Sequence, residues 1–197
     1  LKVSSRKQKI VVVGGGPAGL EAARVSALRG HQVVLFEKGE QLGGQTLIAI
    51  RAPGRQDFDG FCRWAGIQCE KHGVDIRLNC AADIETIVAE SPDLVFIATG
   101  ATARRPDLVG LEGHNVASAW DVLMDEAGEL GDTVLVIDEE YGSQGPGVAE
   151  YLHDRGKEVD LITSEETIVN FLGATTRPPL LTRLFRKGIQ MFHHLEA

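Results

Sequence analysis

The feature that most constrains the fold is a glycine-rich turn between two short apolar segments near the start of the chain. Residues 10–13 form an apolar run suited to a buried parallel strand, and residues 20–29 continue beyond the turn as a helix. A second apolar run, residues 33–36, ends in Glu37. Strand, glycine turn, helix, strand and acid in this register predict a dinucleotide-binding turn.

The glycines of this turn have separate predicted tasks. Gly14 makes the tight turn, Gly16 lets the backbone approach a pyrophosphate, and Gly19 allows close packing of helix and strand. The N-terminus of the helix offers unpaired N–H groups and a positive dipole end to phosphates. Glu37 is placed to accept hydrogen bonds from a ribose 2′-hydroxyl and to repel a 2′-phosphate. We therefore expect an adenine nucleotide at this turn.

Composition bounds the remaining possibilities. A chain of 197 residues, 43% of them hydrophobic, can form one large or two small domains. Its net charge of −8 argues against nucleic acid or an anionic membrane as partner. The three cysteines lack metal-ligand spacing, which favours a reduced, cytoplasmic setting. Because the chain starts without methionine and ends in an apolar run at residues 188–192, we expect a fragment of a longer protein, truncated at the C-terminus.

The first predicted unit spans residues 1–103. It contains a glycine-rich loop over residues 39–54, a helix over about residues 56–72, a half-buried strand over residues 74–78 and a buried strand over residues 94–98. The helix carries an apolar stripe that we expect to face the core, made of Phe58, Phe61, Ala65 and Cys69.

A connector over residues 104–130 precedes a second predicted unit over residues 131–197. This unit contains a strand over residues 133–137, a helix over about residues 147–155 and a strand over residues 159–163. The fold class that follows is α/β, with two tandem Rossmann-like nucleotide-binding units and parallel sheets.

The second unit repeats the first with its turn altered. Two turn glycines return as Gly142 and Gly145, but the first is replaced by the longer segment 138–141, which contains three acids. Thr163 stands where the first unit has its acid. Acids beside phosphates are repulsive, so we expect a degenerate scaffold that binds NAD(P)H poorly or not at all.

The chain also resembles a known family, and several segments carry the resemblance. They are residues 14–23, 35–38, 42–45, 52–55, 97–101, 119–123 and 144–150. Together they are similar to the C-terminal nucleotide-binding region of the family that contains NADH:flavin oxidoreductases, 2,4-dienoyl-CoA reductase and trimethylamine dehydrogenase.

The resemblance implies a cofactor set and partners. It implies FAD, or ADP alone, at the first site, and leaves NAD(P)H at the second site doubtful. It places FMN and a 4Fe–4S cluster on an N-terminal (β/α)₈ barrel that this chain lacks. Members with a degraded pyridine-nucleotide site pass electrons to an electron-transferring flavoprotein, and the altered turn of the second unit is similar to theirs.

Carried over residue by residue, the resemblance gives a candidate cofactor site. The pyrophosphate turn is expected to contact the diphosphate, Glu37 the adenosine ribose and Lys38 the adenosine. The loop at Gly44 is expected along the diphosphate or ribityl chain, with the neighbouring strand end closing the pocket. The complete set is Gly14, Gly16, Pro17, Ala18, Gly19, Glu37, Lys38, Gly44, Gln45, Ala98, Thr99 and Gly100.

Three functions remain open at this point. The first is an electron-transfer module of a flavin oxidoreductase, in which the chain alone is not catalytically complete. The second is a non-redox scaffold that holds ADP and docks an electron-transfer partner. The third is a free-standing NAD-dependent dehydrogenase that uses the first site.

Residues that invite chemical roles have structural explanations, and we assign no catalytic residue. The paired histidines lack a partner with metal-ligand spacing and are expected on a plain strand, where neighbouring side chains point to opposite sides, or on a tail. Glu150, early in its predicted helix, is expected to interact with the helix dipole. We expect structural or surface roles for Cys62, Cys69, Cys80, Trp64, Trp120, Arg104–Arg105 and His193–His194.

Overall fold

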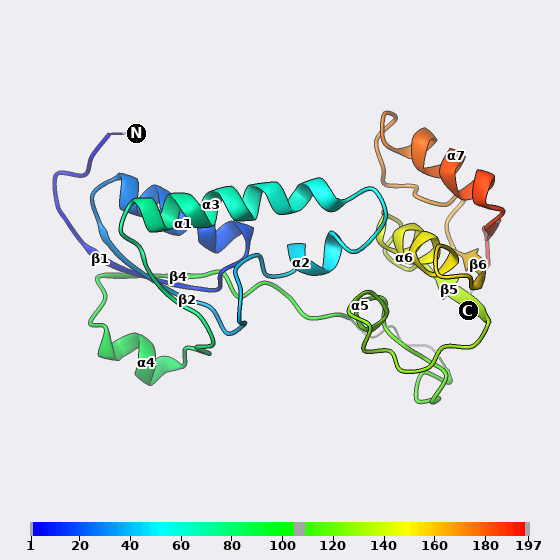
Figure 1. The fold of residues 1–197 in the computed structure, drawn as a ribbon, viewed down its shortest axis with the longest axis horizontal. Helices are drawn as coiled ribbons and strands as arrows, with labels where there is room; N and C mark the ends of the chain where they lie inside the picture. Colours follow the sequence, from blue (N-terminus) through cyan, green and yellow to red (C-terminus); the bar gives the residue numbers. More distant parts are fainter. Residues whose placement is uncertain (1, 105–108, 196–197) are drawn as a thin grey trace. The chain divides into compact units, whose positions relative to one another are not determined.

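The computed structural model describes residues 2–104 and 109–195 of the chain. The fold divides into two compact units, Leu1–Ile50 with Arg55–Thr102 and Arg51–Gly54 with Ala103–Ala197. Each unit is built on a parallel sheet with helices packed against it (Figure 1). The prediction of an α/β fold with two Rossmann-like, parallel units is confirmed.

The sheet of the first unit has the order β3-β2-β1-β4, and its neighbouring strands are all parallel. The strands are β1 (Lys9–Val13), β2 (Gln32–Phe36), β3 (Asp75–Arg77) and β4 (Leu94–Ile97). Helix α1 (Pro17–Leu28) makes the crossover from β1 to β2. The central strands are apolar after their first residue because helices cover both of their faces.

The remaining helices of this unit are α2 (Thr46–Ala49), the 3₁₀ turn η1 (Gln56–Phe58), α3 (Asp59–Lys71) and α4 (Ile84–Ala89). Figure 1 shows α1 and α3 on one face of the sheet and α4 on the other. The short α2 lies within the segment expected to be a loop.

Two layers of apolar side chains hold the first unit together. Between the sheet and helices α1 and α3 lie Ile10, Val12, Leu20, Ala23, Val33, Leu35, Cys62, Ala65, Cys69 and Val74. On the opposite face lie Val11, Val13, Val34 and Phe36, packed against Cys80, Ala82, Ile87 and Val95. Alternate residues of each central strand therefore supply the two layers.

The predicted core stripe of α3 is wrong in its first half. Phe58 and Phe61 are 53% and 42% exposed, whereas Ala65 and Cys69 are buried, together with Cys62. Helix α3 packs closely on α1, and only small residues fit between the two helices. The large side chains of α3 therefore lie on its outer side. The outward residues, called here the α3 stripe, are Phe58, Phe61, Trp64 and Ile67.

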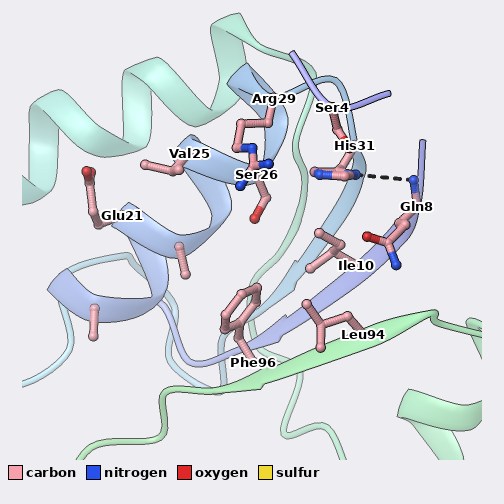
Figure 2. Close-up of a pocket in the computed structure, with 12 residues that line it drawn as sticks. Ser4, Gln8, Ile10, Glu21, Val25, Ser26, Arg29, His31, Leu94 and Phe96 are labelled. Atoms are coloured by element: carbon pink, nitrogen blue, oxygen red, sulfur yellow. Dashed lines mark hydrogen bonds between the residues drawn. The ribbon is translucent and has the colours of Figure 1, made fainter. Parts of the chain in front are cut away.

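The prediction that β4 is a buried strand is also wrong. β4 is an edge of the sheet, and Leu94 and Phe96 are 43% and 38% exposed. Both side chains face a groove of about 550 Å³ between β4 and α1 (Figure 2). Ile10 and Val25 also line the groove.

The second unit has a sheet of order β5-β6-β7, also parallel. Its elements are α5 (Ala119–Leu123), β5 (Thr133–Ile137), α6 (Gln144–His153), β6 (Glu158–Ile162), α7 (Arg177–Lys187) and β7 (Gln190–Phe192). Helix α5 begins with a capping box in which Ser118 and Asp121 exchange hydrogen bonds. Arg105 lies outside the described residues, whereas Arg104 lies 4.0 Å from Glu139.

Helices α6 and α7 depart from the expectation. α6 begins three residues before the predicted start, so Glu150 lies in its middle rather than in its first turn. α7 was not predicted, although Pro178 and Pro179 near its start and Gly188 at its end, with φ of +77°, are boundary signals. Within the described ranges, no helix combines the length and apolar character needed to cross a bilayer.

The paired histidines lie on a tail after the last strand, one of the two expected placements. His193 and His194 follow β7 instead of lying on it, and His194 has a positive φ of +58°. Their Nδ1 atoms lie 2.8 Å apart, so the side chains do not point to opposite sides. No group of three potential metal ligands is found among the described residues.

Candidate functional site

Gly14 opens the turn after β1 in a conformation that requires glycine. Its φ is +109°, and a Cβ there would lie 2.3 Å from the carbonyl oxygen of Ala98. Its N–H donates to the carbonyl of Phe36 at 2.8 Å, and the N–H of Ala98 donates to Val13 at 2.8 Å. The turn is therefore held between the carboxyl ends of β2 and β4, where ligands of open parallel sheets bind.

Gly19 makes the close contact between α1 and this turn. A Cβ at Gly19 would lie 1.8 Å from the carbonyl oxygen of Gly14, so any larger residue would push the helix away from the strand. This is the packing role that the sequence predicts for the third glycine of the turn.

Gly16 differs from both, because the fold does not require glycine there. Its φ is −76°, and the nearest atom to a Cβ would be the Cα of Gly44 at 3.9 Å. Gly16 is the N-cap of α1, and among the described residues no side chain caps this helix. The N–H groups of the first helical turn are thus free to bind an anion, with the positive end of the helix dipole behind them.

Glu37 is buried at the end of β2, where its carboxylate braces the turn. It accepts the N–H of Gly15 at 2.6 Å on Oε2 and the N–H of Gly39 at 2.7 Å on Oε1. An ionised carboxylate has about four lone-pair positions, so both oxygens keep acceptor capacity for ribose hydroxyls. The structure thus adds a scaffolding role to the residue that the sequence singled out.

Two further segments meet the turn. The N–H of Gly43 donates to the carbonyl of Gly15 at 2.9 Å, and a Cβ at Gly44 would lie 3.0 Å from the Cα of Gly16. Gln45 donates from Nε2 to the carbonyl of Ala101 at 2.7 Å, which joins the loop to the segment after β4. Three separate parts of the sequence therefore line one cradle.

The structure brings together nearly all of the predicted site residues. Lys38 is exposed beside the buried Glu37. Sequence reasoning missed Gly15 and Gly43, whose backbone groups join the turn, the acid and the loop. The residues at the cradle are Gly14, Gly16, Pro17, Ala18, Gly19, Glu37, Gly44, Gln45, Ala98, Thr99 and Gly100.

The corresponding turn of the second unit has a different construction. Asp138 follows β5 directly and is 2% exposed. A Cβ at Gly145, in the first turn of α6, would lie 2.7 Å from both Cβ and Cγ of Asp138. Side-chain atoms thus fill the contact that backbone atoms make in the first unit.

The cysteines behave as structural residues. Cys62 and Cys69 are buried, Cys80 is partly buried, and all three are free thiols. Burial raises the pKa of the Cys69 thiol to about 11, so the reactive thiolate is disfavoured at neutral pH. Trp64 lies under the Arg24 guanidinium, 5.0 Å from its ring centre, on the surface of α3.

A parallel sheet, a glycine turn at its carboxyl edge and an uncapped helix N-terminus define a Rossmann-like nucleotide-binding protein. The comparison with protein families agrees, since residues 8–196 match the pyridine nucleotide-disulphide oxidoreductase family. The chain belongs to this family of FAD- and NAD(P)-binding domains, and the resemblance to flavin oxidoreductases predicted from the motifs is confirmed.

Individual relatives extend this picture. The chain is 40% identical over 191 residues to N,N-dimethylglycine/sarcosine dehydrogenase of Chromohalobacter salexigens, covering 94% of this chain and 27% of the relative. It is 38% identical over 192 residues to NADH oxidase of Thermoanaerobacter brockii, covering 96% and 29%.

A solved structure shows the same arrangement. A 2-naphthoyl-CoA reductase complex superposes with a TM-score of 0.92 at 29% identity, covering 99% of this chain and 29% of the other. The chain therefore spans less than a third of the length of these relatives.

Proposed function

We propose that the first unit, ending near residue 103, binds the adenosine diphosphate part of FAD, and that the chain is an electron-transfer module of a larger flavin oxidoreductase. Gly16 carries this proposal. Glycine is not needed there for the fold, yet it stands at the uncapped N-terminus of α1. A side chain at Gly16 would project from the cradle toward the space that a pyrophosphate needs.

The roles of the other cradle residues follow from their positions. The N–H groups of the first turn of α1 would bind the diphosphate, Glu37 would accept the ribose hydroxyls, and Lys38 would flank the adenosine. Gly44 and Gln45 would line the diphosphate or ribityl chain, and residues 98–100 would close the pocket. A bound flavin supplies the electron chemistry, and the protein supplies position and electrostatics.

The test compares Gly16→Ala with Gly60→Ala in the full-length protein. The first should lower nucleotide occupancy at least tenfold without loss of folding, because its Cβ meets ligand rather than protein. Gly60 is the matched control: it lies on α3 with nothing within 4 Å of its Cβ. Occupancy is measured by chromatography of the nucleotide released on unfolding, and equal occupancy in both variants would contradict the proposal.

A second function is a non-redox scaffold that holds ADP permanently. The buried Asp138 in the second turn favours the scaffold. If the second unit does not bind a pyridine nucleotide, no hydride is delivered there, and the first unit needs no flavin to accept one. Flavin absorption together with released FAD supports the redox module. A colourless protein that releases ADP supports the scaffold.

We propose that the rest of the protein includes a barrel with FMN and a 4Fe–4S cluster. Two observations support this proposal. The chain covers less than a third of the length of its relatives, and the exposed α3 stripe is an apolar surface that such a module would cover. A cytoplasmic location is supported by the free thiols.

The electron partner can be determined on the full-length protein under anaerobic conditions. Bleaching of flavin absorbance by NADH indicates a reductase. Bleaching by an amine, followed by reoxidation on adding electron-transferring flavoprotein, indicates a member similar to trimethylamine dehydrogenase. The altered second turn leads us to expect the second result.

A further inference from the structure

We infer that the second unit is closed to dinucleotides by its own side chains, with Asp138 filling the phosphate turn and Tyr141 bridging the side where an adenosine ribose would lie. This goes beyond the proposed function, which concerns the first unit. It also departs from what membership of the family implies for the second unit.

Backbone hydrogen bonds identify equivalent positions in the two units. Gly14 donates its N–H to Phe36, the last residue of β2, at 2.8 Å. Asp138 donates its N–H to Ile162, the last residue of β6, at 2.9 Å. The strand registers also match: Phe36 pairs with the last residue of β1, and Ile162 pairs with the last residue of β5. Asp138 therefore occupies the position of Gly14.

The Asp138 side chain occupies the junction between β5 and α6. The Asp138 side chain packs against Gly145, because a Cβ added at Gly145 would lie 2.8 Å from Oδ1 of Asp138. Oδ1 accepts the N–H of Glu140 at 3.3 Å, while Oδ2 is buried without a hydrogen-bond partner among the described residues. A buried carboxylate at the start of α6 repels a second anion brought to the same helix end.

Tyr141 closes the neighbouring side. Its φ is +55°, and its carbonyl accepts the N–H of Phe171 at 3.1 Å. Its ring packs edge-on against Phe171, with centroids 5.8 Å apart, and its hydroxyl lies 3.4 Å from Oγ of Ser164. The longer turn is thus tied across to the segment after β6, which is the region where Glu37 lies in the first unit.

Thr163 confirms that this region has lost its ribose acceptor. It occupies the position after β6 that Glu37 occupies after β2, and it is 2% exposed. Its hydroxyl accepts the N–H of Glu165 at 3.3 Å, as Glu37 accepts that of Gly39. This local bond to the residue two positions on is kept, but a hydroxyl replaces the carboxylate that braces the glycine turn and has spare acceptor positions in the first unit.

The experiment restores the space in the full-length protein. The double variant Asp138→Gly/Tyr141→Gly removes both obstructions, and glycine suits the positive φ of Tyr141. Binding of NADH is followed by its fluorescence, with the first site saturated by ADP. The parent should show no saturable binding below millimolar NADH, and the double variant should bind at least tenfold more tightly.

Two further variants keep the inference falsifiable. Asp138→Asn keeps the shape of the side chain, removes its charge and disturbs folding less than the double variant. It should give part of the gain in NADH affinity. Glu139→Gln removes a neighbouring acid that is partly exposed, and it should give none. Saturable binding to the parent at the second unit, no gain in either Asp138 variant, or an equal gain from Glu139→Gln would each overturn the inference.

The first unit is monitored separately. Nucleotide released on unfolding should be the same for the parent and for these variants, because the substitutions lie in the other unit. Absence of nucleotide in all preparations would count against the proposed function and leave the comparison of NADH binding intact.

Discussion

At the scale of one residue, the carboxylate of Glu37 contributes both to the stability of the fold and to the proposed nucleotide binding. Its carboxylate holds two backbone N–H groups, and in the proposed function it also accepts the ribose hydroxyls. A substitution therefore changes the stability of the free protein as well as its affinity for adenosine. The two effects separate when stability is measured with and without nucleotide.

We predict that Glu37→Gln lowers the free energy of unfolding of the nucleotide-free protein by about 1–3 kcal/mol, because one N–H loses a charged acceptor. Glu37→Arg should lower it further and abolish adenosine binding. Urea unfolding measures the first effect and calorimetry with ADP the second. Glu40→Gln, at an exposed neighbour, is the control, and unchanged stability in Glu37→Gln would contradict the bracing role.

Asp138 predicts a pH dependence of stability. Burial raises the pKa of its carboxyl to about 6 from an ordinary value of 3.8; the backbone N–H groups of Glu140 and Tyr141 oppose this rise, and the negative charges of Glu140 and Glu139 add to it. The folded state thus favours the protonated form. Stability from this group is fully present below pH 3.8 and is lost as the pH rises through about 6, by up to ~3 kcal/mol.

Asp138→Asn should therefore stabilise the protein at pH 8, and the gain should disappear as the pH falls below 4. Thermal unfolding at a series of pH values measures the difference between variant and parent. A gain that does not change with pH would show that the carboxylate is not the titrating group. Asp132→Asn is a control at an exposed carboxylate of the same unit.

At the scale of elements, Glu150 joins α6 to α7. Its side chain is 2% exposed, and its oxygens lie 3.1 Å from Nε and Nη2 of Arg183 and 3.1 Å from Nζ of Lys187. In place of the expected dipole role, the buried carboxylate of Glu150 holds two partly exposed cations of the neighbouring helix.

Glu150→Ala should lower the free energy of unfolding by about 1–3 kcal/mol, because it removes the charged acceptor shared by Arg183 and Lys187. Asp154→Asn is the matched control, since Asp154 contacts the same Lys187 at an exposed position and should cost less than ~1 kcal/mol. Denaturant unfolding of both variants decides the matter. Similar losses would contradict a special contribution from the buried pair.

Local patterns predicted most elements of the first unit but misplaced several faces. The spacing of apolar residues indicated the helix near residues 56–72, yet α3 packs through Cys62, Ala65 and Cys69 rather than through Phe58 and Phe61. Which stripe of a helix is buried depends on how closely it approaches its neighbour. That approach is set by residues of α1 far away in the sequence.

At the scale of the whole molecule, the exposed apolar surface of this chain matters most. The relatives are more than three times as long as the part that this chain matches. The α3 stripe exposes a large apolar side chain at every third residue from the end of η1 into α3, and exposed apolar surface of this kind is typical of contact with another protein part.

We predict that hydrogen exchange in α3 of the full-length protein is at least tenfold slower than in this chain alone. Covering the α3 stripe would suppress local opening of the helix. The exposed face of α4, at Ile84 and Val88, provides an internal control. Equal exchange of α3 in both proteins would contradict contact between the α3 stripe and the remaining chain.

The sequence by itself determined the α/β class, the parallel strands and the position of the glycine turn, because these follow from short-range spacing and from conformations that only glycine adopts readily. Tertiary structure decided the rest. That Asp138 stands in the place of Gly14 became visible through strand register, and Arg183, one partner of Glu150, lies 33 residues away in sequence. Such contacts join residues that no local period connects, so only the folded chain reveals them.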